Sequence, residues 1–545
     1  MDQNMTTGFG GDQEAQNWQN NRHLVYWEEL REREEQDRQK RQEERQRGAA
    51  VFGRMAAASA IYALIYTICL YRNSSGITSP LWVAATLGYV WYAQRALNVA
   101  VKRGSGFVAA VMLLLGISNF LTGNRWIIFL NYTGIFLLLV ALLLHNYAMD
   151  HGWDIGTYLR QIVVAVFGAV GSIGKPFSDG AAFRDTRKQK TLGRGAYIGL
   201  GIAVAIPCVL FLGVLLATAD MVFGDMMQRA FSVFRFPDQS FGILFMLIFG
   251  FFSSYCGMRF MEVHAPGIIV SDKKKGEPLT AVIVTGAITL LYLMFCVIQI
   301  AYLFVGGLRL PEGVTYAEYA RSGFFQLLFV CILNLILVLA VKKYFRESGV
   351  LNILLILISG CTFVMTASSA WRMLLYIRAY QLTFLRVSVL VALAAIALLM
   401  VGVVAMIVWP GFPLFRYGLC VVCSVYLLFS FSHVDYFIAS YNLSHVKLLP
   451  AAEMAAGRGV VDYQYIYSLS TDAAPAIAAY IKDYPGSVPS SEGWKERFSP
   501  ENHDWAVESW VDQYLMHNYK AMTEVGVRNF NISHYTAYRL FQDEL

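Results

Sequence analysis

The sequence predicts an all-α fold, a polytopic transmembrane helix bundle with a C-terminal soluble helical domain. Of the 545 residues, 56% are hydrophobic and only 15% are charged, whereas soluble domains carry about a quarter charged residues. The apolar residues are grouped in runs of about 20, the length at which a helix crosses a bilayer. Because backbone polar groups inside lipid must be paired within the protein, we expect these runs to be helices.

The apolar runs predict about eleven membrane spans. They lie near residues 52–71, 77–94, 107–122, 126–146, 196–217, 240–258, 279–305, 324–341, 350–370, 385–409 and 412–431. Lys and Arg are concentrated in the loops on the side of the N-terminus, which the positive-inside rule assigns to the cytoplasm. The cationic residues of the opposite loops are all arginine: Arg72, Arg125, Arg229, Arg235, Arg309, Arg321, Arg372, Arg378 and Arg386.

Changes in composition divide the chain into five expected segments. They are a disordered stretch with a charged helix (1–50), a four-span unit (51–150), an amphipathic interfacial helix with a basic linker (151–195), a seven-span core (196–431) and an extracytoplasmic helical domain (432–545). The charged helix contains Glu and Arg four residues apart, such as Glu34 with Arg38, which stabilises isolated helices. The basic loops on the cytoplasmic side are expected to attract anionic phospholipid.

Charged residues on the predicted outer face are the candidate binding site. Arg372 and Arg378 have apolar neighbours in the sequence, and a buried guanidinium requires an acidic partner or an anionic ligand. The candidate outer-face cluster consists of Asp220, Asp225, Glu318, Arg321, Arg372 and Arg378. An internal salt-bridge network is the alternative to a ligand site. Thr315 and Glu318 also have the spacing of a capping box that would start the next helix.

The other polar residues favour a role in helix packing over a role in transport, metal binding or catalysis. Asn131, Gln299 and Asn334 lie near the middle of predicted spans, where we expect interhelical hydrogen bonds. No acidic, basic or histidine residue lies near a span centre, which disfavours an ion-coupled carrier. The cysteines and histidines lack metal-site spacing, so we expect no metal, no cofactor and no nucleic acid.

Five motifs occur in order along the chain: LLATADMVF, VIQIAYLFVGG, TYAEYARSGFFQLLFV, SSAWRMLLYIRAY followed by QLT, and DYFIASYNLSHV. This set resembles a family of multi-pass bacterial membrane proteins catalogued as domain of unknown function four-one-seven-three, related to four-one-five-three. The resemblance covers roughly residues 195–475. Gln381 stands where the family pattern has glycine, and SHV replaces an Asn-Pro-Asp lead, whereas Asp435, Tyr441 and Asn442 match. The resemblance implies an inner-membrane location and no established activity.

These observations favour a non-enzymatic scaffold or sensor of the bacterial cell envelope that binds a partner protein or an anionic ligand on its outer face. The N-terminus would lie inside the cytoplasmic membrane and the C-terminal domain outside. A transporter or lipid-handling protein is one alternative. A membrane transferase acting on a lipid-linked substrate, with Asp220 or Glu318 as the base, is another.

Overall fold

A computed structural model describes residues 10–150, 153–186, 220, 226, 239–264, 276–301, 324–409, 411–446, 462–483 and 510–544. Within these residues every regular element is a helix, which confirms the predicted all-α fold. The described helices before the C-terminal elements are α1 (Gly10–Leu70), α2 (Thr78–Ala96), α3 (Ser105–Leu121), α4 (Arg125–Tyr147), α5 (Ile155–Gly171), α6 (Lys175–Thr186), α9 (Gln239–Val263), α10 (Pro278–Gln299), α12 (Phe324–Tyr344), α13 (Gly349–Tyr380), α14 (Phe384–Val408) and α15 (Leu414–Phe431). The C-terminal elements are α16 (Val434–Val446), α18 (Tyr463–Tyr467), η2 (Thr471–Ala473), α19 (Ala474–Asp483), α21 (Trp510–Thr523) and α22 (Ile532–Glu544).

Membrane-spanning length and composition occur in 8 of the described helices, or up to 9 if α5 and α6, which are bent by 56°, form one broken span. The polytopic prediction is therefore confirmed. A helix lies at each predicted span except 196–217, which is outside the described residues. The 17-residue α3 and the more polar α2 are not among the 8.

The chain folds as two compact units. The first comprises Met1–Ile68, Gly88–Val101 and Val163–Ala265, and the second Cys69–Leu87, Lys102–Ile162 and Pro266–Leu545. In the first unit, Arg259 is 1% exposed and binds both carboxylate oxygens of Asp179, at 2.7 Å from Nε and 3.3 Å from Nη2. Tyr255 donates a further hydrogen bond of 2.9 Å to the same carboxylate. This bidentate pair satisfies a charge that would otherwise be costly to bury, and it joins α6 to α9.

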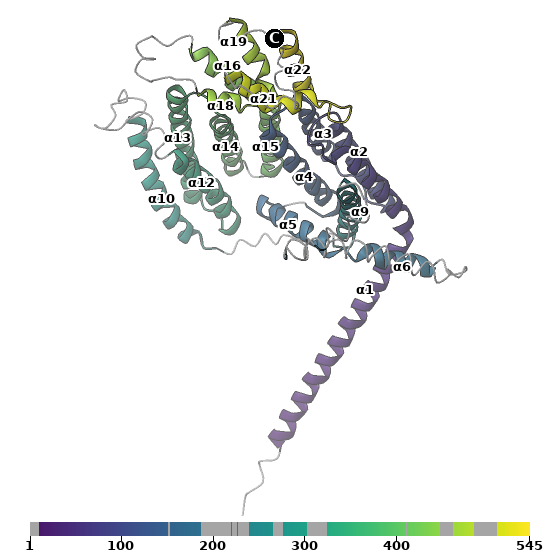
Figure 1. Ribbon diagram of the computed structural model, residues 1–545. Coiled ribbons are helices and arrows are strands. Elements are labelled where there is room, and N and C mark those ends of the chain that lie inside the picture. Colours follow the sequence, from purple (N-terminus) through teal and green to yellow (C-terminus); the bar gives the residue numbers. More distant parts are fainter. Residues whose placement is uncertain are drawn as a thin grey trace, which may run out of the picture. The chain divides into compact units, whose positions relative to one another are not determined.

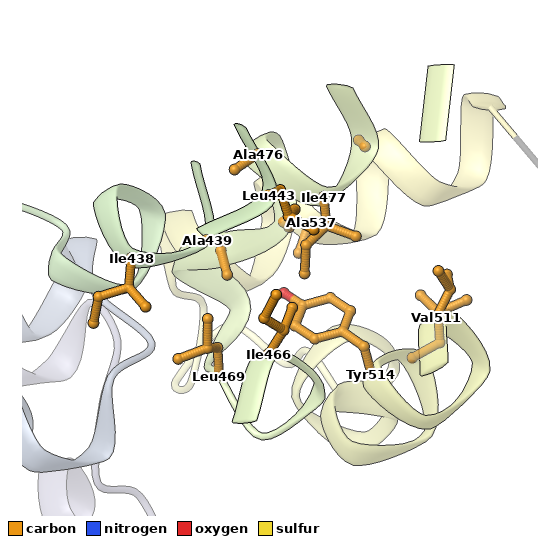
Figure 2. Close-up of a cluster of buried hydrophobic side chains, with 14 of the residues drawn as sticks. Ile438, Ala439, Leu443, Ile466, Leu469, Ala476, Ile477, Val511, Tyr514 and Ala537 are labelled. Carbon is orange, nitrogen blue, oxygen red and sulfur yellow. The ribbon is translucent and has the colours of Figure 1, made fainter. Parts of the chain in front are cut away.

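The second unit contains a membrane bundle and the C-terminal helices. Helix α13 packs against α10, α12 and α14, and α14 packs in turn against α12 and α15. Helix α3 packs against α4 and α15. The C-terminal helices lie at one end of this bundle (Figure 1). Their apolar faces meet in one core, drawn in Figure 2, which includes Ile438, Leu443, Ile466, Leu469, Ile477, Val511, Tyr514 and Ala537.

Polar residues inside the bundle bond to one another across helices, as predicted. Asn334 of α12 accepts a hydrogen bond from Tyr292 of α10 at 2.7 Å and donates one to Thr362 of α13 at 2.9 Å. Gln299 of α10 accepts from Ser368 of α13 at 2.7 Å. Such bonds contribute modestly to helix association in lipid because the separated helices also find partners.

The turn between α13 and α14 contains one departure from the family pattern. Gln381 follows the last residue of α13 and has φ 67° and ψ −178°, a conformation that is adopted almost only by glycine. The amide side chain of Asn442 in α16 holds the next residue, Leu382, by accepting from its N–H at 2.8 Å and donating to its C=O at 3.0 Å. The motif SSAWRMLLYIRAY with its QLT and the motif DYFIASYNLSHV therefore meet at this turn.

We predict that Gln381→Gly stabilises the protein, because glycine relieves backbone strain that costs about 1–3 kcal/mol while losing about 0.5–1 kcal/mol of chain entropy. Thermal unfolding in detergent measures the effect. Gln94→Gly, inside helix α2, is the control and should destabilise the protein. A lower midpoint for Gln381→Gly than for the unaltered protein would contradict the prediction.

Candidate functional site

The predicted outer-face cluster is described only in part. Asp225, Thr315, Glu318 and Arg321 lie outside the described residues, and Asp220 is exposed. Arg372 is 8% exposed and its Nη2 lies 3.3 Å from Oε1 of Gln299, the same oxygen that accepts from Ser368. Arg378 is exposed, because six residues rotate a helix by about 240° and place it on another face of α13.

A different polar cluster lies wholly within the described residues of the second unit. It lies where the turn between α3 and α4 meets the C-terminal helices. We call it the buried acidic cluster, and it comprises Thr122, Gly123, Asn124, Asp435, Ser470, Thr471 and Asp472. Its two carboxylates, Asp435 in the first turn of α16 and Asp472 in η2, are 2% and 5% exposed.

Asp472 is bound by the α3–α4 turn. The backbone N–H of Gly123 donates to Oδ1 at 2.8 Å, and the hydroxyl of Thr122 donates to Oδ2. His433 approaches from the junction of α15 and α16, with Nδ1 3.7 Å from Oδ2. A side chain at Gly123 would collide with the cluster, since its Cβ would lie 2.1 Å from Oγ1 of Thr471. The turn can therefore approach the carboxylate only with glycine at this position.

Asp435 is bound from two sides. Its Oδ1 accepts from Nδ2 of Asn124 at 2.9 Å, and its Oδ2 accepts from the backbone N–H of Ser470 at 3.1 Å and from the Ser470 hydroxyl at 2.6 Å. A buried carboxylate loses its water, and these donors replace that water. Asp435 thus connects α16 both to the α3–α4 turn and to the segment that precedes η2.

Two asparagines act as helix caps and as bridges at the same time. The Asn124 carbonyl oxygen caps α4 by accepting from the N–H groups of Trp126 and Ile127 at 2.9 and 3.0 Å, while its amide nitrogen binds Asp435. Asn531 caps α22 in the same manner, and its amide nitrogen donates to the backbone oxygens of Asn119 and Thr122 at 3.1 and 2.9 Å. Local capping therefore orients both side chains toward the other part of the unit.

The hydrogen bonds continue from the cluster into the bundle. Asn119 in α3 accepts from Nδ2 of Asn131 in α4 at 2.8 Å. The carbonyl oxygen of Asn131 accepts from Tyr426 and Ser430 of α15 at 2.7 and 2.8 Å. This continuity connects the C-terminal helices to three bundle helices.

The ionisable groups of the cluster shift one another's pKa values. Burial, followed by the negative charge of Asp472, raises the pKa of Asp435. Burial also acts to raise the pKa of Asp472, but His433, Ser533, Thr122 and the Gly123 N–H outweigh it and hold that pKa below its ordinary value. The Asp472 carboxylate raises the pKa of His433. Asp435 therefore takes up a proton before Asp472 as the pH falls.

A family model for a domain of unknown function, DUF4153, matches residues 109–480. The chain belongs to the DUF4153 family. Of the two related families that the motifs resemble, four-one-five-three is the one that matches. No curated protein and no solved structure is similar to the chain. The DUF4153 match includes all seven residues of the buried acidic cluster, whereas Asn531 and Ser533 lie beyond it.

Some sequence signals pointed to members of the cluster without predicting that they meet. Asp435 belongs to the motif DYFIASYNLSHV, one of the five that carry the family resemblance. Ser470 forms a cap by accepting from the N–H of Asp472. Thr122 and Asp472 are separated by about 350 residues in the sequence, so no local sequence pattern could predict their contact. The structure describes a DUF4153 protein in which capping residues and buried acids join the C-terminal helices to the bundle.

We predict that the contribution of His433 to stability depends on pH. Its pKa is raised in the folded protein, so its stabilisation is complete below the unfolded value and is lost as the pH rises through the folded value. His433→Asn keeps a residue that tolerates the positive φ of 48°. It should cost about 0.5–1 kcal/mol below about pH 6, as a solvent-screened pair does, and nothing at alkaline pH.

Thermal unfolding midpoints across this pH range measure the effect. His264→Asn, at an exposed histidine that follows α9, is the control and should show no such pH dependence. An equal loss for His433→Asn at every pH would mean that the imidazole contributes packing and not charge.

Proposed function

We propose that this membrane protein is a non-enzymatic scaffold or sensor of the cell envelope, in which the bundle holds the C-terminal helical domain for binding a partner protein. The observation that carries the proposal is the bonding of the buried acidic cluster. Asp435 and Asp472 accept hydrogen bonds from Asn124, Ser470, Thr122 and Gly123. Buried carboxylates whose oxygens already accept hydrogen bonds from the protein are suited to holding two segments together. A carboxylate that acts as an acid or base catalyst must instead reach a substrate.

An anionic ligand at the outer-face cluster is the second part of the proposal. The cluster consists of Asp220, Asp225, Glu318, Arg321, Arg372 and Arg378. Its support is the burial of Arg372 at the junction of α10 and α13, where Nη2 of Arg372 donates to Oε1 of Gln299 at 3.3 Å. A planar guanidinium suits carboxylate or phosphate oxygens.

One observation favours the transferase alternative. The His433 side chain is 45% exposed and lies beside the buried Asp472, and a carboxylate that supports an accessible imidazole is an arrangement used in general base catalysis. Under this alternative His433 would act on the substrate, and Asp472 would orient its ring.

The two functions predict opposite results for His433→Asn, whereas Asp472→Asn should impair both. For a scaffold, Asp472→Asn should lower stability by about 1–3 kcal/mol, because the single amide oxygen cannot accept from both the Gly123 N–H and the Thr122 hydroxyl. The variant should also weaken complementation of a strain that lacks the gene. His433→Asn should complement fully, and so should the exposed control Glu524→Gln. If His433→Asn abolishes complementation at a pH where its stability is unchanged, the protein is an enzyme and the scaffold proposal is wrong.

We further propose that the N-terminus is cytoplasmic and that the C-terminal domain lies outside a bacterial inner membrane. The support is the excess of Lys and Arg in the loops on the N-terminal side. We predict that Lys482→Cys, at an exposed position of α19, reacts with a membrane-impermeant maleimide in intact cells. The native chain has no cysteine after Cys423, so the unaltered protein is the control. Labelling only after lysis would reverse the orientation.

A further inference from the structure

We propose that the α21–α22 turn, together with the adjoining ends of α1 and α4, forms a phospholipid-binding surface. In this surface Arg72, Arg125 and Arg528 bind lipid phosphates, and Val527 and Trp126 enter the apolar part of the headgroup region. The surface would hold the C-terminal domain against the membrane. This interaction goes beyond the proposed scaffold function, since it concerns lipid and not a protein partner.

The turn is fixed at the level where a candidate span ends. Arg528 Nη2 donates to the backbone oxygen of Tyr71 at 2.5 Å, and the Arg528 backbone oxygen accepts from Asn73 at 3.0 Å. The backbone N–H of Ile77 donates to Phe530 at 2.9 Å. Helix α1, a candidate span, ends at Leu70, so the turn that contacts residues 71–77 lies at the same depth as the end of that span.

Close backbone approach maintains this position. Gly76 has φ 111°, and a Cβ there would lie 2.8 Å from the carbonyl carbon of Asn529. Only glycine fits both the conformation and the space. The register between the two turns is therefore set by backbone contacts and leaves the side chains of the surface exposed.

A second candidate span reaches the same surface. The Phe530 ring lies 6.1 Å from that of Phe120, near the end of α3, and α22 packs against α3 (Figure 1). Helix α4, a candidate span, begins at Arg125 a few residues later. The positive charge of Arg125 helps to lower the pKa of both His517 and His534, after burial as the larger cause. Arg125 is thus close to the C-terminal helices as well as to the end of its span.

The exposed residues of the surface combine arginine with large apolar groups. Val527 is 89% exposed, the highest value among the large apolar residues that the structure describes, and Trp126 is 66% exposed. Arg72, Arg125 and Arg528 are exposed, and Glu524 is an exposed acid of the same turn. In water the apolar groups would be unfavourable, whereas the interface of a membrane accepts Trp and Val beside arginine bound to phosphate.

The proposed surface continues into exposed apolar residues on the sides of α4 and α2, and this continuity favours lipid as the partner. Below Trp126, α4 exposes Phe129 at 62%, and below the 71–77 turn α2 exposes Leu81 at 57%. These residues belong to helices that are expected to face acyl chains. An apolar surface that continues directly into a lipid-facing surface, with arginines at its edge, has the charge and polarity of the headgroup layer. It also gives a reason for the arginines on the predicted outer face.

The test uses the full-length protein in nanodiscs of equal parts phosphatidylglycerol and phosphatidylcholine. We expect native mass spectrometry to show selective retention of phosphatidylglycerol. Each arginine near an anionic surface contributes about 5-fold in affinity, so Arg72→Gln with Arg528→Gln should reduce the selectivity about 25-fold at low salt. Lys482→Gln, which removes an exposed cation elsewhere on the domain, should leave it unchanged. Equal retention by the double variant would overturn the proposal.

A second measurement does not depend on the arginines. Val527→Trp changes an exposed position and should not disturb folding. The fluorescence of the introduced tryptophan is obtained by subtracting that of the unaltered protein. Lipids brominated near the headgroup end of the acyl chain should quench it in Val527→Trp but not in Lys482→Trp. Lack of quenching for Val527→Trp would show that the turn lies in water and would also overturn the proposal. The scaffold function is tested separately by complementation, so either idea can fail alone.

Discussion

The desolvation of Asp435 and Asp472 is the constraint on which the arrangement of the second unit depends. Both carboxylates are almost fully buried, and a buried carboxylate is tolerated only when hydrogen-bond donors replace its water. The donors come from the α3–α4 turn and from the segment before η2. Separation of these segments would leave buried acceptors without partners, so the same groups that are costly to bury oppose undocking of the C-terminal helices.

The bonds of the cluster also join the membrane bundle to the C-terminal helical module. From Asp435 the network runs through Asn124 and Asn531 to the α3–α4 turn, and through Asn131 to α15. The membrane part and the C-terminal helices therefore share a continuous set of hydrogen bonds. A change of protonation at Asp435 would act directly on the hydrogen bonds that join these segments.

Arginine has different roles at different depths of the protein. Arg259 is buried and paired with Asp179, and Arg372 is buried beside Gln299. Arg72, Arg125 and Arg528 are exposed beside apolar residues at the ends of helices. The guanidinium suits each setting because it stays charged and offers several donors in a plane, whether to a carboxylate, an amide oxygen or a phosphate.

The sequence alone determined that the protein is a helical membrane protein, because the length and apolarity of the runs leave no other way to pair the backbone in lipid. It also determined the family, through ordered motifs. It marked Gln381 as unusual, and the backbone at that residue shows the reason. Only the tertiary structure decided that Asp472 meets Thr122 and that Asp435 meets Asn124. Helical periodicity and capping reflect neighbours within a few residues, whereas these contacts depend on which turns the packed helices bring together.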